Sequence, residues 1–476
     1  MIAASNLQAA QHRLARLYLT KLQTVEDAMR RSVVNKIYGK SLLDKEWPQI
    51  IRWQQHAASN LGTAGGWAQL CRDYGSQAIN TIFFTCTITE RIAWWKSALE
   101  AARLAGDKLF ERTFLNKLAG EYSSLGQLDT VKTYALELLA LAQSDNDLNF
   151  IANATYQLAT IAEDQGYLDE AVQYYQQALA LFEQLKFEVK IGRALYGLGA
   201  IALTQGDFAE AHRYFSRYQV LTDQPGLEGD HCYALQGVAE ALQNLGQLDA
   251  AEAAFGQAIN LARQISFQNA IGPVLIGLGS CLLERGQLTE AIANLEEGMI
   301  LAREYSGLGD ALHALTRLGY AYWQRHEWSP ALAYLLEALE KARQSQFRLH
   351  LVRIHRYLSL VYLSMGQVSE SRQHLLAALL ENQSLNSLPE QAQLLLTAAL
   401  YAARIGSAQL GAHWLGAALP RTDAGSPVAT QAHREVLSAL GAERVHALLT
   451  EGRDLSVETM LQQVIHQLES TGGAPA

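Results

Sequence analysis

The chain of 476 residues is 49% hydrophobic and has only 8 prolines, a composition typical of a folded, helix-rich protein rather than a disordered one. Its formal net charge of −9 argues against a general nucleic-acid-binding role, because neutralising phosphates requires a clustered excess of Lys and Arg. The N-terminus lacks the basic start and apolar core of a signal peptide, no run of about 18 apolar residues predicts a membrane span, and the four cysteines form no CxxC pair. We therefore expect a cytoplasmic protein whose thiols are reduced and mostly buried.

Residues 1–66 are predicted to form an N-terminal helical cap or linker. They contain Gly39-Lys40-Ser41, which matches the end of the phosphate-binding motif G-x-x-x-x-G-K-[ST]. The place of the first glycine in that motif is taken by Val34, and the preceding TVEDAMRRSVVNKI predicts an amphipathic helix rather than a strand. A loop without its first glycine is poorly suited to point successive N–H groups at a phosphate. We expect a turn between two helices at Gly39 and no nucleotide site.

A repeat with a period of 40 residues organises the next part of the chain. Residues 67–105 fit one degenerate copy, with Cys86 where later copies have glycine, and residues 106–410 contain the clear copies. We call the recurring residue the pivot, and the pivots are Gly126, Gly166, Gly206, Gly246, Gly286, His326, Gly366 and Gly406. A glycine after an apolar helical run ends a helix in a left-handed conformation, and three residues later a capping residue such as Asp169 or Asp249 predicts the next helix start. Each copy is therefore predicted to be helix A, a tight turn and helix B.

Apolar and small residues also recur in register with the pivots. A leucine or valine stands eight residues before most pivots and a small residue follows it, as in Leu198-Gly199, while alanine is frequent five residues after the pivot, as at Ala211. Small residues on both helices allow a close approach of the two axes, and such a hairpin must stack on its neighbours to bury its apolar face. The pattern in LYGLGAIALTQGDFAEAHRYF (195–215) resembles the tetratricopeptide repeat, in the 40-residue subclass found in kinesin light chains and bacterial signalling ATPases. This resemblance implies an all-α solenoid, a right-handed superhelix of antiparallel helix pairs with helical caps.

Residues 411–476 are predicted to be a C-terminal helical cap with a short disordered tail of six residues. The segment PRTDAGSPVAT interrupts the pattern, and two further helical segments follow it. The C-terminal GAHWLGAALPR and HREVLSALGAERVHALLTEG are similar to the end of bacterial STAND regulators, including those with a LuxR-type DNA-binding domain. The N-terminal SLLDKEWPQIIRWQQHA is similar to the helical segment after an NB-ARC ATPase domain. These resemblances imply the sensor part of such a protein, with a separately encoded ATPase or DNA-binding protein as a possible partner.

No sequence motif assembles a catalytic or metal centre. RHEW is not the zinc motif HExxH, and His350 and His355 are five residues apart, off a common helical face. There is no G-x-S-x-G elbow and no Cys/His nucleophile signature. Acidic pairs such as Glu163-Asp164 are expected at helix ends or on exposed faces, where carboxylates set for acid–base work cannot be distinguished from solvated charges. We expect no catalytic residues, no metal, no nucleotide and no cofactor.

The remaining candidate site is the concave groove that helix A lines in this architecture. Groove-facing positions are expected 13, 10, 6 and 3 residues before each pivot. The residues predicted from these offsets are Asn153, Tyr156, Arg193, Tyr196, Tyr233, Gln236, His313, Tyr320, Trp323, Arg353 and Arg356. Related proteins that grip a C-terminal carboxylate use Lys and Asn there, which disfavours that role. Aromatic residues with Arg are enriched at protein interfaces, although several of these tyrosines could instead pack between adjacent repeats.

The sequence thus predicts a non-catalytic scaffold or sensor for a protein or peptide partner in bacterial cytoplasmic signalling, with no direct nucleic-acid or membrane binding. One alternative is a receptor for a small ligand or signal peptide that changes the conformation of the superhelix. A second alternative is the detached C-terminal part of an NTPase-type transcriptional regulator. An enzymatic function would require nucleotide turnover.

Overall fold

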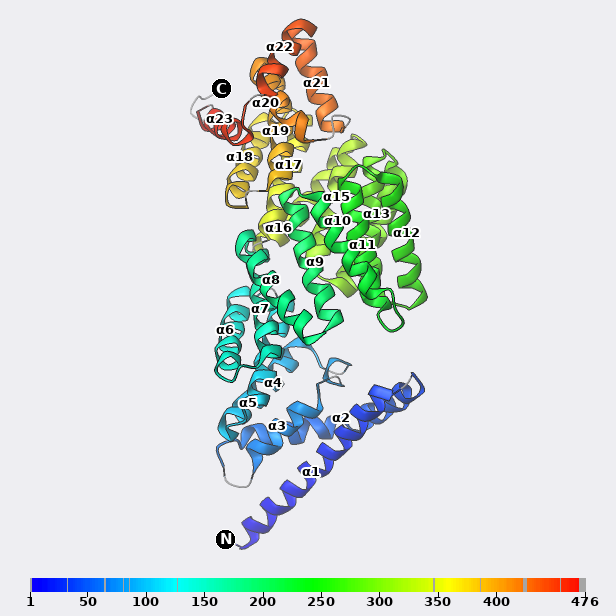
Figure 1. The fold of residues 1–476 in the computed structure, drawn as a ribbon, viewed down its shortest axis with the longest axis vertical. Coiled ribbons are helices and arrows are strands. Elements are labelled where there is room, and N and C mark those ends of the chain that lie inside the picture. Colours follow the sequence, from blue (N-terminus) through cyan, green and yellow to red (C-terminus); the bar gives the residue numbers. More distant parts are fainter. Residues whose placement is uncertain are drawn as a thin grey trace. The chain divides into compact units, whose positions relative to one another are not determined.

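The computed structural model describes residues 2–31, 33–63, 66–79, 81–84, 86–125, 127–345, 347–385, 387–422, 426–453 and 455–470 (Figure 1). All regular elements in these ranges are helical, which confirms the predicted all-α solenoid. The contacts divide the chain into two compact units, Met1–Ile161 and Ala162–Ala476. The pivot Gly126 and the predicted disordered tail, residues 471–476, lie outside the described residues.

The first unit contains the long N-terminal helices and the first helical pairs. Its α-helices are α1 (Ile2–Arg31), α2 (Val33–Ser59), α3 (Trp67–Gln77), α4 (Ile88–Ala105), α5 (Lys108–Ser124), α6 (Leu128–Ser144) and most of α7 (Leu148–Asp164). A short 3₁₀ helix, Thr81–Phe84, precedes α4. Gly39-Lys40-Ser41 lies inside α2, so the turn predicted at Gly39 is wrong. The helix that begins at Val33 continues past this glycine, because a single glycine only weakens a helix.

The second unit continues the array and ends in the C-terminal helices. It contains α8 (Leu168–Leu185), α9 (Glu188–Gln205), α10 (Phe208–Thr222), α11 (Glu228–Asn244), α12 (Leu248–Gln264), α13 (Gln268–Glu284), α14 (Leu288–Leu301), α15 (Leu308–Gln324), α16 (Trp328–Ser345), α17 (Arg348–Ser364), α18 (Val368–Leu385), α19 (Leu388–Arg404), α20 (Ala408–Ala418), α21 (Pro427–Leu440), α22 (Ala442–Arg453) and α23 (Val457–Ser470). No helix in the described part of the chain combines the length and hydropathy that crossing a bilayer needs.

The pivots end helix A as predicted. The seven described pivots from Gly166 to Gly406 all have φ between 61° and 85°, the left-handed region that favours glycine. At Gly206 the amide donates to the carbonyl of Leu203 at 3.2 Å, and the amide of Asp207 donates to the carbonyl of Ala202 at 2.9 Å. This pair of hydrogen bonds satisfies the last carbonyls of the helix. The helix A, turn, helix B unit is therefore confirmed.

The predicted cap of helix B is wrong by two positions. Helix B begins two residues after each pivot, for example at Leu168 and Leu248, so Asp169 and Asp249 lie inside the first turn. The reason is that the residue immediately after the pivot both closes the preceding turn and serves as the cap. Asp207 does this with its side chain, which accepts from the amide of Glu210 at 3.1 Å. The carboxylates inside the first turn still favour the positive end of the helix dipole.

Close approach of helices A and B depends on the small residues found in the sequence. Ala211 is fully buried and Leu198 is 3% exposed, as their register predicts. A Cβ on Gly279 of α13 would lie 3.0 Å from the carbonyl oxygen of Ala291 in α14, so only glycine permits this spacing. The four cysteines are buried thiols, and burial raises the pKa of Cys71 to about 11.

The second unit closes on itself through the turn between α18 and α19. The Oγ of Ser387 donates to the carbonyl of Thr204 at 2.9 Å, although the two residues are 183 positions apart. Leu385 packs on Gly166, where any Cβ would overlap its side chain, and Pro389 packs on Gly206. We call Leu385, Ser387, Leu388 and Pro389 the closing turn. It brings the start of α19 against the pivots that end α7 and α9.

Candidate partner-binding surface

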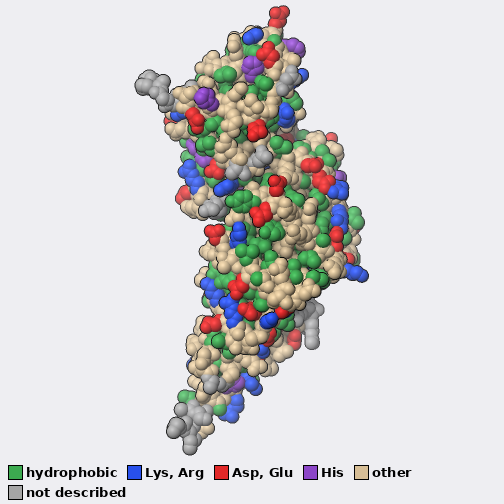
Figure 2. All heavy atoms as spheres, turned by 60° about the vertical axis from the view of Figure 1, so that its left-hand side comes forward, with side chains coloured by type: hydrophobic (Ala, Val, Ile, Leu, Met, Phe, Trp, Pro, Cys, Tyr) green, Lys and Arg blue, Asp and Glu red, His purple; other side chains and the backbone are tan. Residues whose placement is uncertain are grey.

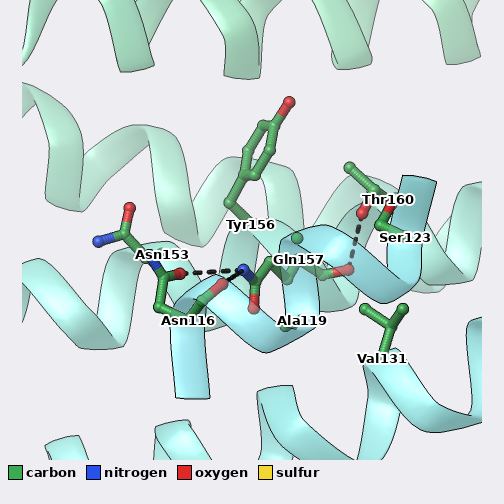
Figure 3. A pocket seen from close by; sticks show the side chains of 9 residues that line it. Asn116, Ala119, Ser123, Val131, Asn153, Tyr156, Gln157 and Thr160 are labelled. Atoms are coloured by element: carbon green, nitrogen blue, oxygen red, sulfur yellow. Dashed lines mark hydrogen bonds between the residues drawn. The ribbon is translucent and has the colours of Figure 1, made fainter. Parts of the chain in front are cut away.

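A pocket of about 310 Å³ lies between α5, α6 and α7 in the first unit (Figure 3). We call it the amide pocket, and it is lined by Asn116, Ala119, Gly120, Ser123, Val131, Asn153, Tyr156, Gln157 and Thr160. Asn153, Tyr156 and Thr160 lie 13, 10 and 6 residues before the pivot Gly166. The groove offsets of the repeat therefore point into a real hollow at this place.

Neutral amides are the main polar groups of this pocket. Figure 3 shows Gln157 pointing toward Asn116, and its Nε2 donates to Asn116 Oδ1 at 2.9 Å. The Oε1 of Gln157 is buried and has no hydrogen-bond partner among the described residues. Gly120, on the same helix as Asn116, leaves open space at the pocket, because a Cβ there would meet nothing within 4 Å. An unmet acceptor beside paired amides suits a ligand that brings N–H donors.

Asn116 and Gln157 were not predicted as groove residues. Asn116 stands 10 residues before position 126, so the same offset, applied to the first clear repeat, would have found it. Gln157 follows Tyr156 and lies one position off the offsets, and only the geometry of α5 against α7 reveals it.

In the second unit, two of the predicted tyrosines pack against aromatic neighbours. Tyr196 is half-buried, with ring centroids 5.4 Å from Phe215 and 6.4 Å from Tyr218. Tyr233 is half-buried, with its ring 5.6 Å from Phe267. These contacts support the alternative reading in which part of the aromatic set stabilises the array. Arg193, by contrast, is exposed, and its Nε lies 3.7 Å from Asp230 Oδ1.

The aromatic residues of α15 form a stack that continues into α17. Tyr320 lies between Trp323 and Tyr357, at centroid distances of 5.5 and 4.7 Å. Trp323 is 5% exposed, and its Nε1 donates to Ser364 Oγ at 3.0 Å. Trp323 therefore holds adjacent repeats together, while the half-buried Tyr320 and His313 keep part of their surface open.

Arginines gather beside this stack. Arg353 Nε donates to Glu390 Oε1 at 2.6 Å, and the guanidinium of Arg356 lies 4.2 Å from the centre of the Tyr357 ring. Burial would raise the pKa of Glu390, but the nearby arginines outweigh burial and hold it below its usual value. Glu390 is therefore a buried carboxylate that stays charged.

Several carboxylates of the A helices are more buried than the sequence suggested, and burial raises their pKa. Glu163 is half-buried and accepts a hydrogen bond from the Tyr175 hydroxyl at 2.7 Å, and burial raises its pKa to about 7. Glu163 is thus not simply a solvated charge, because the end of α7 faces protein. Burial also raises the pKa of Glu240, six residues before its pivot, and that of Asp310 to about 6.

On the face drawn in Figure 2, Lys and Arg side chains are interspersed with Asp and Glu rather than gathered into one basic patch. Among the residues that the structure describes, no three His, Cys, Asp or Glu side chains are arranged to hold a metal ion.

Two protein-family models match the repeat region of the chain. The model of the MalT-like TPR region matches residues 186–419, and that of the tetratricopeptide repeat matches residues 150–218. Comparison with curated protein sequences gives no match.

Two solved structures share the fold over most of their length. The first is a Rap protein complexed with Competence and Sporulation Factor, at 15% identity and a TM-score of 0.55, covering 81% of this chain and 99% of that chain. The second is aspartyl phosphate phosphatase F from Bacillus subtilis, at 13% identity and a TM-score of 0.50, covering 69% and 94%. At these identities the likeness concerns the fold alone. Together with the in-register pivots and the family matches, it establishes this chain as a helical repeat protein of the tetratricopeptide type.

Proposed function

We propose that this protein is a non-catalytic scaffold or sensor that binds a protein or peptide segment along its helix A surface, in bacterial cytoplasmic signalling. The observation that carries the proposal is the amide pocket, which is lined by the predicted groove residues Asn153 and Tyr156 of α7 and by residues of α5 that were not predicted. A peptide backbone alternates N–H donors and C=O acceptors, and side-chain amides present both kinds of group. The similar Rap structure, a complex with a factor, supports the same proposal.

A substitution that fills the pocket tests this function. Gly120→Leu places a side chain in the open space of the pocket without removing any existing contact. Gly256→Leu is the matched control, because Gly256 also lies within a helix, α12, and also has nothing within 4 Å of its Cβ position. Random peptides displayed on phage would be selected on wild-type protein and rescreened on both variants.

We expect the selected peptides to be retained by Gly256→Leu and lost, by at least tenfold in affinity, on Gly120→Leu. Equal retention by both variants would place the binding surface elsewhere, and no enrichment on the wild type would count against the function.

The non-catalytic part is tested separately, since one similar structure bears the name of a phosphatase. Incubation of this protein with a second protein that carries an aspartyl phosphate should leave the rate at which that phosphate is lost unchanged. A faster loss of phosphate would refute this part of the proposal.

A second candidate is a receptor in which a small ligand or signal peptide changes the conformation of the array. The closing contact of Ser387 with Thr204 favours it, because one contact between distant repeats can be made or broken. Ligand-dependent change in small-angle scattering of the purified protein would support it, and stabilisation without any such change would not. The match to the MalT-like TPR region also supports a role as part of an NTPase-type regulator, for which a separately encoded ATPase should co-purify.

A further inference from the structure

Two arginines of α17 pair with one carboxylate in the second unit, and an arginine of α15 acts on it electrostatically. Arg317, Arg353 and Arg356, which we call the arginine cluster, all act electrostatically on Glu390 at the start of α19. Among the described residues, Glu390 is the only carboxylate in an ion pair with the cluster, at 2.6 Å from Arg353 and 3.6 Å from Arg356. Two guanidiniums thus share a single carboxylate, which also lies in the electrostatic field of a third.

The pairing is incomplete. Arg356 is 4% exposed and Glu390 is 5% exposed, yet within the described ranges Arg356 Nε and Glu390 Oε2 have no hydrogen-bond partner. Their separation of 3.6 Å is too long for a hydrogen bond. A buried donor without an acceptor is unfavourable, so the cluster retains capacity for another anionic oxygen.

The other carboxylates near the cluster act on it electrostatically: Glu240 on Arg353, and Glu284 on Arg317. His313 accepts a hydrogen bond at Nε2 from Arg317 Nε, at 3.3 Å, and burial lowers the pKa of His313 well below its usual value. Burial lowers the pKa of His350 to about 3. Glu284, which acts on Arg317 from a distance, is exposed and accepts from Gln243 Nε2 at 2.6 Å. Arg317 and Arg353 are only half-buried, which leaves an approach to the cluster.

We propose that the arginine cluster binds an anionic oxygen group of a ligand, a carboxylate or a phosphate, and that Glu390 occupies part of this site until the ligand displaces it. Planar guanidiniums that share one carboxylate match the paired oxygens of such groups. The proposal deepens the proposed function by naming an anionic feature of the partner, but it concerns a site in the second unit and is tested with small anions alone.

Displacement of Glu390 would also act on the closing turn. Glu390 follows Pro389 directly, and Ser387, which caps α19, makes the hydrogen bond to Thr204. An anion that releases Glu390 from Arg353 removes one of the restraints on this end of α19. The anion site and the closure of the array therefore share one short segment.

Removal of the internal carboxylate provides the main test. Glu390→Gln keeps the size of the side chain and removes its charge, and the titrants are inorganic phosphate and glutarate at constant ionic strength, followed by calorimetry. We expect Glu390→Gln to bind one of these anions at least tenfold more tightly than wild type, and Glu390→Gln/Arg356→Gln to lose the gain. The matched control is Glu435→Gln, which removes the carboxylate of the surface pair with Arg404.

The two anions distinguish a phosphate-bearing partner from a carboxylate-bearing one. Equal affinities in Glu390→Gln and Glu435→Gln would overturn the proposal, whether or not peptide capture by the first unit succeeds.

Hydrogen exchange on the wild type gives a readout that needs no variant. Saturating anion should speed exchange in Leu388–Leu394 and Ala200–Gly206 at least threefold while α5 is unchanged. Unchanged exchange in both segments would overturn the link to the closing turn.

Discussion

The imidazoles of His355 in α17 and His374 in α18 face each other with their Nδ1 atoms 2.8 Å apart. One Nδ1 must donate and the other accept. The accepting Nδ1 carries no proton, so at least one of the two imidazoles is neutral. Burial, with His374 and Arg343 nearby, lowers the pKa of His355 to about 4, and burial with Arg343 also lowers that of His374. The pair is a neutral contact in a place where added charge is unfavourable.

Acid should therefore weaken the protein through this pair. The pKa of His355 rises from about 4 in the folded protein to the ordinary 6.5 on unfolding. The unfolded chain therefore binds more protons in this window, and stability falls as pH drops from 6.5 toward 4. The full effect is of order 3 kcal/mol. In His355→Gln the destabilisation relative to wild type should shrink from pH 7.5 to pH 4.5 in urea unfolding. A constant difference across this range would contradict the assignment, and the exposed His446→Gln serves as the matched control.

Glu163 should give the opposite pH dependence. Its pKa is about 7 in the folded protein against 4.5 unfolded, so the stability that the protonated form contributes is complete below 4.5 and is lost as pH rises through 7. Glu163→Gln can still accept from Tyr175 and should be more stable than wild type at pH 8, by about 1–3 kcal/mol, and equal to it near pH 4.5. Denaturant titrations at both pH values measure this. A gain that persists at low pH, or one matched by the exposed Glu297→Gln, would argue for another cause.

Two helical glycines should respond to alanine with opposite signs. At Gly279 a methyl group would press on the Ala291 carbonyl, 3.0 Å away, and we expect Gly279→Ala to lose about 1–3 kcal/mol. At Gly256 the space is open, and Gly256→Ala should gain about 0.5–1 kcal/mol from helix propensity. Thermal unfolding of both variants provides the comparison. Equal effects would mean that helices α13 and α14 can move apart.

The pivot His326 is a position where the sequence departs from the rule and the backbone does not. Its φ is +61°, in the same left-handed region as the described pivot glycines, whose φ runs from 76° to 85°. His326→Gly should relieve left-handed strain of about 1 kcal/mol, partly offset by loss of the contact between its ring and Trp328, whose centroid is 5.3 Å away. The converse change, Gly366→His, should destabilise. Calorimetric melting checks both, and a less stable His326→Gly would show that the Trp328 contact dominates.

The ends of the A helices could be predicted from the sequence because they depend on local backbone conformation. A left-handed residue recurring every 40 positions can be read from glycines such as Gly206 and Gly246, because few other residues tolerate that backbone. The same conformation also ends helix B at Asn146, Lys186 and Ser266. The sequence did not reveal the left-handed conformation at these three positions, because a different residue type occupies each of them.

Non-local geometry accounts for what was missed. Offsets along helix A find Tyr156, but the pairing of Gln157 with Asn116 depends on how α7 packs on α5. The charged state of Glu390 depends on arginines more than 30 positions away, and nothing near Ser387 signals its contact with Thr204. Which of the predicted groove residues contact a partner stays a prediction.

The contact between Ser387 and Thr204 also fixes how long the array can be. An open solenoid can gain or lose a whole repeat and remain in register, because each unit touches only its neighbours. In this protein the distance along the array from Gly166 to Leu385 must bring two particular turns face to face. Duplication or deletion of one 40-residue unit between them would preserve every local interface and still misplace that meeting point. The contact between these two turns therefore requires a fixed number of repeats in the second unit.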